Sequence, residues 1–134
     1  MKLSSKTITA IKMFVDLGEH YEDGFISLVD IAKRKDVSKK FLEQIVPLYK
    51  ASGLLVGTRG NQGGYRLAKA PKEVTLKDIV YISENGLGKE NTGYAPIDSF
   101  LNQIDGHLDL FLEKKTLVDL IETAKESYSN DYII

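Results

Sequence analysis

Apolar residues recur every three or four positions along most of the chain, the spacing that places them on one face of an α-helix. The pattern predicts a first helix over 6–17, a second in SLVDIAKRK at 27–35 and a third in SKKFLEQIVPLYKASG at 38–53. Ser27 and Ser38 stand just before the second and third apolar runs, where a hydroxyl caps the first turn of a helix. Pro47 lies inside the third run, and its missing N–H predicts a kink or a local break there.

The pattern changes after the third helix. LLVG and YRLA are short apolar or alternating runs of the kind found in β-strands, and they flank the glycine-rich segment TRGNQGG. Gly60, Gly63 and Gly64 reach positive φ without steric cost, so they permit a tight reversal that brings the backbone close to another group. The segment predicts a β-hairpin whose tip projects beyond its strands. A fourth helix follows in APKEVTLKDIVYISE, with Thr75 and Asp78 in capping positions.

The second half of the chain predicts two further helices after a loop. The loop at 85–96, NGLGKENTGYAP, is rich in glycine and asparagine. A wide apolar stripe then predicts a long helix, and its members are Ile97, Phe100, Leu101, Ile104, Leu108, Phe111 and Leu112. A short helix capped by Thr116 and a C-terminal tail complete the segment 97–134. The predicted fold class is mostly α with a small β-hairpin (α+β), and 1–84 form its first domain.

Composition excludes several function classes. The chain has 134 residues, of which 43% are hydrophobic, enough for one domain with a real core. It has no cysteine, which excludes disulfides, thiolate nucleophiles and cysteine-held metal sites. The glycine-rich loop lacks the lysine and hydroxyl residue of a P-loop, and neither His20 nor His107 has an evident catalytic partner, so we expect no enzyme.

No apolar run approaches the ~20 residues that cross a bilayer, and the N-terminus lacks a secretory signal, so we expect a soluble, cytoplasmic protein without membrane contact.

Charge divides the chain into two unlike halves. Residues 1–70 hold 12 Lys and Arg against 7 Asp and Glu, whereas residues 71–134 hold 6 against 12. Three helices, a hairpin with a long glycine-rich tip and a basic balance together describe a winged helix-turn-helix domain, in which the second helix of the pair enters the DNA major groove. A solvated surface explains any one of these features, but their combination favours double-stranded DNA as a partner.

In this interpretation DNA contacts lie on a recognition helix, 38–52, and on a wing, 58–64. The exposed positions at the start of the helix are Ser38, Lys39, Lys40, Glu43 and Gln44. A carboxylate can accept from the amino group of cytosine, a glutamine can pair with adenine, and serine or lysine can contact bases or phosphates. Arg59 is placed to enter a narrow minor groove, where the potential is most negative. The predicted set is completed by Gly60, Asn61, Gln62, Gly63 and Tyr65.

The sequence resembles the Rrf-two (IscR/CymR-type) family of winged-helix transcription regulators over nearly the whole chain. The resemblance is carried by MKLSSK, SLVDIAKRKDVSKKFLEQI, ASGLLVGTRGNQGGYRLAKAP, TLKDI and TLVDLIE. It implies a homodimer in which the long helix crosses to its partner, with the apolar stripe as the interface. It also implies a role in DNA binding for particular residues: Ser38, Lys40, Glu43 and Gln44 as groove contacts, Arg59 in the minor groove and Lys6 on a phosphate.

One departure from the family pattern concerns iron. Cluster-binding members carry three cysteines between the fourth helix and the long helix and a histidine just beyond. This chain has Thr92, Asp98 and Ile104 in that region and keeps only His107. The resemblance therefore implies a cysteine-free member without an iron–sulfur cluster. His107 as a ligand for another metal is an alternative, although a lone histidine on a polar helix face is usually solvated.

The C-terminal segment SYSNDYII raises the question of a partner enzyme. It resembles the C-termini of serine acetyltransferases, which insert into O-acetylserine sulfhydrylase, and a cysteine-free branch of the family senses through that enzyme. By this resemblance Tyr132, Ile133 and Ile134 would enter a pocket of the partner, where backbone donors hold the terminal carboxylate. The alternative is a tail that packs on its own dimer or frays.

The leading hypothesis is a homodimeric, sequence-specific regulator that acts as a repressor, reads a partly palindromic operator and is connected with sulfur or cysteine metabolism. The alternative is a protein-interaction module or co-regulator that acts on a partner enzyme through its tail. Three kinds of effector stay open: a small molecule in a pocket between the winged domain and the long helix, a partner enzyme, or a metal.

Overall fold

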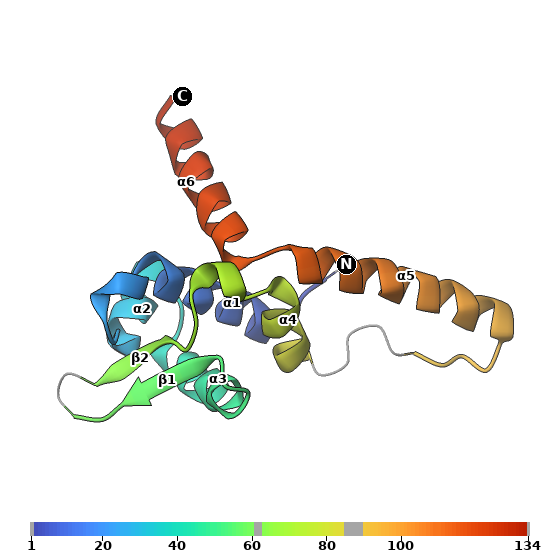
Figure 1. Ribbon diagram of the computed structural model, residues 1–134, viewed down its shortest axis with the longest axis horizontal. Coiled ribbons are helices and arrows are strands. Elements are labelled where there is room, and N and C mark those ends of the chain that lie inside the picture. The colour runs from blue at the N-terminus through green and yellow to red at the C-terminus, as the bar shows by residue number, and fades with distance from the viewer. Residues whose placement is uncertain (1, 61–62, 85–89, 134) are drawn as a thin grey trace.

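Helices make up most of the fold. Among the described residues, the β-structure consists of one two-stranded hairpin. This computed structural model describes residues 2–60, 63–84 and 90–133. In chain order the elements are α1 (Ser5–Glu19), a 3₁₀ turn (Tyr21–Asp23), α2 (Leu28–Lys35), α3 (Lys39–Ala51), β1 (Leu55–Thr58), β2 (Gly64–Leu67), a second 3₁₀ turn (Pro71–Glu73), α4 (Leu76–Glu84), α5 (Ala95–Lys114) and α6 (Leu117–Ile133). The predicted fold class, mostly α with one small hairpin, is confirmed (Figure 1).

The core lies where α1, α3 and α4 meet. Phe14, Leu42, Ile45 and Tyr49 are completely buried there. The rings of Phe14 and Tyr49 meet edge to face with their centroids 4.8 Å apart. The Tyr49 hydroxyl donates to the carbonyl of Ile79 at 2.7 Å, and burial raises the pKa of Tyr49. This one side chain joins α3 to α4 while leaving no buried hydroxyl without a partner.

The helix caps predicted at Ser27, Ser38, Thr75 and Asp78 are confirmed. Ser27 Oγ accepts from the N–H of Asp30 at 3.2 Å, and Ser38 Oγ accepts from the N–H of Phe41 at 3.2 Å. Thr75 and Asp78 cap each other's backbone, at 3.1 and 3.2 Å, before the first turn of α4. These contacts satisfy N–H groups that have no partner inside a helix, and they set the starts of α2, α3 and α4.

Of the kink or local break predicted at Pro47, the break is wrong, because α3 runs without interruption from Lys39 to Ala51. Pro47 lies on the exposed side of α3, as does Glu43, whose carbonyl would otherwise accept from residue 47. Water can replace the lost partner on this side, which lowers the cost of the proline. Leu48 is 36% exposed beside it.

The helix α5 extends from the winged part of the molecule as an arm, and α6 leaves in another direction (Figure 1). The arm begins at Ala95, inside the predicted loop 85–96, and ends at Lys114. Its last turn is fixed by Leu112, which packs with Leu76 and Val80 of α4. None of the described helices is long and apolar enough to cross a membrane.

The helix α6 begins against α1. Leu117 is completely buried, and a Cβ atom added to Gly18 would come within 2.7 Å of the Ile121 side chain. The missing side chain at Gly18 therefore allows the two helices to pack closely. Beyond this contact α6 continues to Ile133, over residues that we expected to form a tail after a short helix.

Candidate nucleic-acid interface

The helix pair α2–α3 is fixed on α1 by an ion pair between the exposed Arg34 and a buried carboxylate. Arg34 donates to both carboxylate oxygens of Asp16, at 2.8 and 2.9 Å, and Asp16 is completely buried. The hydrogen bonds to Asp16 raise the pKa of Arg34. The helix α2 then ends at Asp36, whose φ of 52° is the left-handed conformation of a helix C-cap. The chain turns directly into α3, so α3 is held at the surface by the two helices behind it.

The recognition helix α3 presents its polar side chains as the sequence predicts. Its buried face consists of Leu42, Ile45, Val46 and Tyr49. The residues predicted to contact DNA, Ser38, Lys39, Lys40, Glu43 and Gln44, are all exposed on the first two turns. Lys39 Nζ lies 3.5 Å from a Glu43 carboxylate oxygen, an exposed pair that contributes little to stability. The Ser38 hydroxyl oxygen already accepts a hydrogen bond from the backbone of α3. Its O–H can still donate to a base or a phosphate.

The wing is a regular antiparallel hairpin with a turned tip. Leu55 pairs with Leu67 and Thr58 with Gly64, so Arg59 and Gly60 follow directly at the end of the ladder. Both are exposed. Gly60 has a φ of +107°, a conformation that residues with a side chain rarely adopt. The predicted contacts Asn61 and Gln62 lie outside the described residues.

The other two glycines of the wing let backbone segments of the protein itself approach closely. Gly64 is not among the residues of positive φ, which corrects the expectation for its conformation. A Cβ at Gly63 would lie 2.8 Å from the carbonyl oxygens of Thr58 and Gly60, and a Cβ at Gly64 would overlap the carbonyl of Ile26. The close approach at Gly64 permits two hydrogen bonds of 2.8 Å between Ile26 and Tyr65, which join the wing to the segment before α2.

Two basic side chains near this surface were missed in the sequence. Lys50, on the last turn of α3, lies 5.9 Å from the centre of the Tyr65 ring, and Arg66 lies 5.3 Å from the centre of the Phe25 ring. Only the pairing of the hairpin with its neighbours brings these cations beside the wing. Lys6 is half-buried in the first turn of α1, outside both the recognition helix and the wing.

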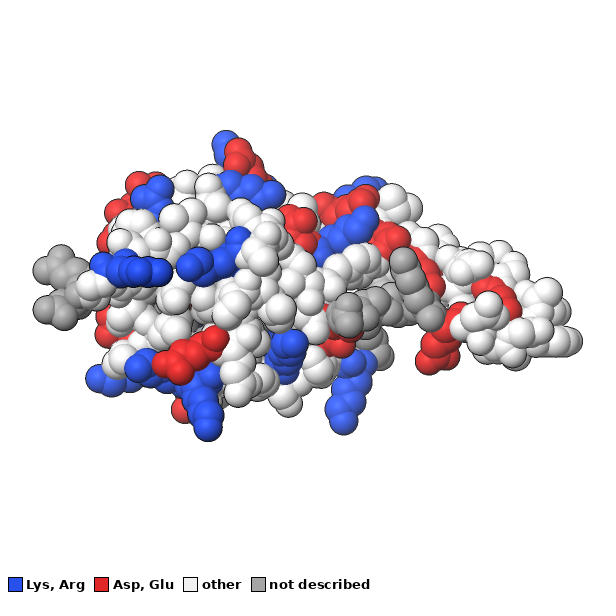
Figure 2. All heavy atoms as spheres, turned by 90° about the horizontal axis from the view of Figure 1, so that it is seen from below, with Lys and Arg blue, Asp and Glu red and all other residues white. Residues whose placement is uncertain are grey.

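Basic side chains are spread over the face that carries α3 and the wing, whereas the outer part of α5 shows Asp and Glu (Figure 2). This distribution matches the division of charge between the two halves of the sequence. An anionic polymer would be attracted to the winged part and repelled from the arm.

The apolar stripe of α5 divides into an exposed part and a buried part. Ile97, Phe100, Ile104 and Phe111 are 45%, 60%, 45% and 59% exposed. Leu101 is half-buried, while Leu108 and Leu112 pack against α4 of the same chain. Leu108 and Leu112 therefore contribute to the core of the single chain, whereas the outer residues are exposed and available for the predicted interface.

A small hollow lies where α4, α5 and α6 meet. Leu76, Phe111 and Leu120 form most of its wall, Lys115 and Asp119 lie at its edge, and its volume is about 180 Å³. It occupies the region between the winged domain and the long helix, where a small-molecule effector is one of the three alternatives.

Family membership follows from the sequence as a whole. A profile of the Rrf2 (Rrf-two) family, described as iron-dependent transcriptional regulator, matches residues 3–123. The chain belongs to the Rrf2 family. Among solved structures, IscR of T. potens has a TM-score of 0.80 with 31% identity, over 95% of this chain and 90% of that one. CymR, the global cysteine regulator of B. subtilis, has a TM-score of 0.81 with 26% identity, over 92% and 98%.

The curated relatives are also regulators. IscR of Cereibacter sphaeroides is 29% identical over 136 residues, which cover 91% of this chain and 88% of that protein. Rrf2 of Nitratidesulfovibrio vulgaris is 32% identical over 84 residues, 63% of this chain and 56% of the relative, so the match spans about half of that protein. This Rrf2-family chain is a transcriptional regulator related to IscR and CymR, and the expectation that it is not an enzyme is confirmed by these relatives.

The residues present do not fit the iron of the family description. Thr92 donates its N–H and its hydroxyl to one oxygen of Asp98, both at 2.8 Å, and these hydrogen bonds lower the pKa of Asp98. Asp98, Ile104 and His107 all lie on α5 itself and not before it. With no cysteine in the chain, this region has no thiolate to hold a cluster. Among the described residues, no group of three or more His, Asp or Glu is placed to hold a metal ion.

Proposed function

We propose that this Rrf2-family regulator is a homodimeric repressor that binds a partly palindromic DNA operator. The observation that carries the proposal is the exposed polar set on the first turns of α3 beside a wing whose tip begins with Arg59. Both elements lie on the basic face of the molecule (Figure 2). A dimer that covers the promoter would exclude polymerase, which is the simplest route to repression.

The recognition helix would read bases in the major groove. Glu43 can accept from the N4 amino group of cytosine, and Gln44 can pair with the edge of adenine. DNA would have to replace Lys39 as the partner of Glu43, but that exposed ion pair is weak and Lys39 could turn to a phosphate. Arg59 would enter the adjacent minor groove, where a narrow groove concentrates negative potential.

Dimerisation would use the outer part of α5. Its exposed apolar residues, Ile97, Phe100 and Ile104, recur at helical spacing, and one face of that kind pairs naturally with a copy of itself about a two-fold axis. Two recognition helices related by such an axis read two half-sites of opposite direction. The two-fold symmetry of the operator follows from that of the protein.

The proposal is tested by selecting bound sequences from a pool of random DNA duplexes and titrating the winning site against salt. An enriched site with two-fold symmetry, and an affinity that falls steeply as salt rises, would support the proposal. Glu43→Gln should then enrich a site that differs at particular bases. If no sequence is enriched, the proposal of sequence-specific binding fails.

The structural neighbour CymR is described as the global cysteine regulator of B. subtilis. This similarity supports cysteine or sulfur metabolism as the process that the present regulator controls. Capture of O-acetylserine sulfhydrylase through a C-terminal tail has no such support. The backbone is helical as far as Ile133, so Tyr132 and Ile133 would have to leave a helix to enter a partner's pocket. Ile134 lies outside the described residues. The interaction-module alternative would therefore require the end of α6 to unwind when it binds a partner.

A further inference from the structure

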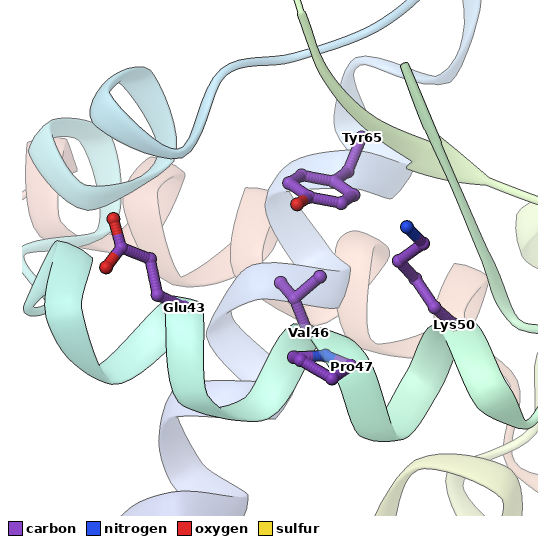
Figure 3. A pocket seen from close by; sticks show the side chains of 5 residues that line it. All are labelled: Glu43, Val46, Pro47, Lys50 and Tyr65. Atoms are coloured by element: carbon purple, nitrogen blue, oxygen red, sulfur yellow. The ribbon is translucent and has the colours of Figure 1, made fainter. Parts of the chain in front are cut away.

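A hollow lies between the recognition helix and the wing. It has a volume of about 380 Å³ and is lined by Glu43, Val46, Pro47 and Lys50 of α3 and by Tyr65 of β2. Val46 and Pro47 form its floor, Tyr65 reaches over it from the wing, and Glu43 and Lys50 stand at opposite ends (Figure 3). The hollow therefore has an apolar base, an aromatic wall and one charge of each sign at its ends.

Lys50 is positioned by the wing and forms no ion pair with a carboxylate of the described residues. Its ammonium nitrogen lies 5.9 Å from the centre of the Tyr65 ring, an attraction that restrains the side chain at the edge of the hollow. It takes part in none of the ion pairs formed among the described residues, whereas Glu43 at the other end is paired with Lys39. A restrained cation without a counter-ion is suited to an anion from outside the protein.

The two charges are far enough apart to act on different groups of a ligand. Glu43 and Lys50 are seven residues apart on a helix, which corresponds to about 10 Å along its axis. This separation is about one screening length at physiological salt, so the carboxylate would repel an anion at Lys50 only weakly. Glu43 can face a base while Lys50 faces the backbone.

We propose that the hollow binds one sugar–phosphate unit of the DNA backbone, with Lys50 as the phosphate ligand. This inference rests on the proposed DNA-binding function. In this proposal the start of α3 lies in the major groove and Arg59 lies in the adjacent minor groove. The DNA backbone that separates the two grooves then has to pass between the helix and the wing, where the hollow lies. The sugar packs on Pro47, which is exposed above the buried Val46, the Tyr65 ring closes the other side, and the phosphate meets Lys50.

A phosphate contact and a base contact differ in their response to sequence and salt. Replacing Lys50 by methionine keeps the apolar stem and removes the charge. Lys50→Met should lower the slope of log affinity against log salt by about 0.9 for each protomer. It should also weaken binding to operator and to random duplex by the same factor, because backbone contacts carry no sequence information. Lys125→Met, an exposed lysine of α6, is the matched control and should leave slope and affinity unchanged.

The location of the contact is tested with a single neutral methylphosphonate placed at successive positions of the duplex. Wild-type protein should lose affinity at every contacted phosphate, and Lys50→Met should abolish that loss at one position in each half-site while it keeps the loss at the others. Circular dichroism and urea unfolding verify that the variant folds. If Lys50→Met keeps the wild-type salt slope, the inference is overturned while DNA binding stands. If the wild type itself shows no salt-dependent binding to any duplex, the proposed function fails and the inference with it.

Discussion

Gly64 illustrates how one missing side chain permits a contact between distant segments. Its Cα faces the carbonyl of Ile26, and the two hydrogen bonds between Ile26 and Tyr65 attach the wing to the body of the domain. A methyl group at this position would force the two backbones apart. The wing would then lose its orientation relative to α3 as well as part of its stability.

We expect Gly64→Ala to destabilise the protein by about 1–3 kcal/mol, the usual cost of overpacking. Gly106→Ala is the control, because Gly106 lies on α5 and a Cβ there meets nothing within 4 Å. That change should stabilise by up to about 1 kcal/mol through helix propensity. Urea unfolding of both variants measures the difference, and equal midpoints for Gly64→Ala and wild type would show that the contact with Ile26 is not tight.

A second prediction at this scale concerns Arg59, exposed at the end of β1. If it enters the minor groove, Arg59→Ala should weaken specific DNA binding by more than tenfold, because both a positive charge and a forked donor are lost. Arg59→Lys keeps the charge and should lose less. Fluorescence anisotropy with the selected site measures both, and an unchanged affinity for Arg59→Ala would refute the role of the wing tip.

Single residues were predictable where local spacing determines their environment. The exposed set on α3 follows from helical periodicity, and the caps at Ser27, Ser38 and Thr75 follow from residue type beside an apolar run. The roles of Gly64 and Lys50 were not predictable, because each depends on a partner, Ile26 or Tyr65, that only the folded hairpin brings near.

Between elements, Glu84 joins the end of α4 to the start of α1. Its carboxylate accepts from the N–H and from the hydroxyl of Ser4, each at 2.8 Å. The hydroxyl of Thr7, followed by the Ser4 donors, lowers the pKa of Glu84 below its usual value of 4.5. Beside this contact Thr7 and Ser83 share a buried hydrogen bond of 2.5 Å, so the joint between the two helices is polar.

The lowered pKa makes the joint sensitive to acid. The ionised carboxylate contributes its full stabilisation above the unfolded-state pKa, and that contribution is lost as pH falls through the lower, folded-state pKa. We expect Glu84→Gln to be less stable than wild type at pH 6 and to lose this difference towards about pH 3. Urea midpoints across this range measure it, with Glu126→Gln on exposed α6 as the control. A difference that does not change with pH would contradict the role of the charge.

The element limits that the sequence missed have a physical cause. The helix α6 continues through ESYSND to Ile133, where polar residues carry no apolar period that would indicate a helix. At Pro47 the missing N–H predicts a break, but exposure of that side of α3 to water makes a continuous helix acceptable. Apolar periodicity identifies helices that bury one face. It does not identify a segment that is helical only because it continues the preceding helix.

At the scale of the whole molecule, the exposed stripe of α5 predicts the state of assembly. Ile104 is 45% exposed in the single chain, between Ile97 and Phe100 on one side and Leu108 on the other. A lysine at this position would have to bury its charged ammonium group in an apolar interface. The free-energy cost of removing water from that group exceeds the stabilisation gained from packing at this site. We expect Ile104→Lys to sediment as a monomer at concentrations where the wild type is a dimer.

Asn102→Lys is the matched control, because residue 102 is exposed on the opposite side of the same helix and receives the same charge. It should remain dimeric, so any loss of association in Ile104→Lys reflects the position of the charge and not its presence. The monomer should keep weak binding to one half-site and lose the tighter binding to the full site. In a dimer the second recognition helix binds as part of the same complex, so it does not lose translational and rotational entropy a second time. An intact dimer for Ile104→Lys would place the interface elsewhere, and the two-fold operator would then need another explanation.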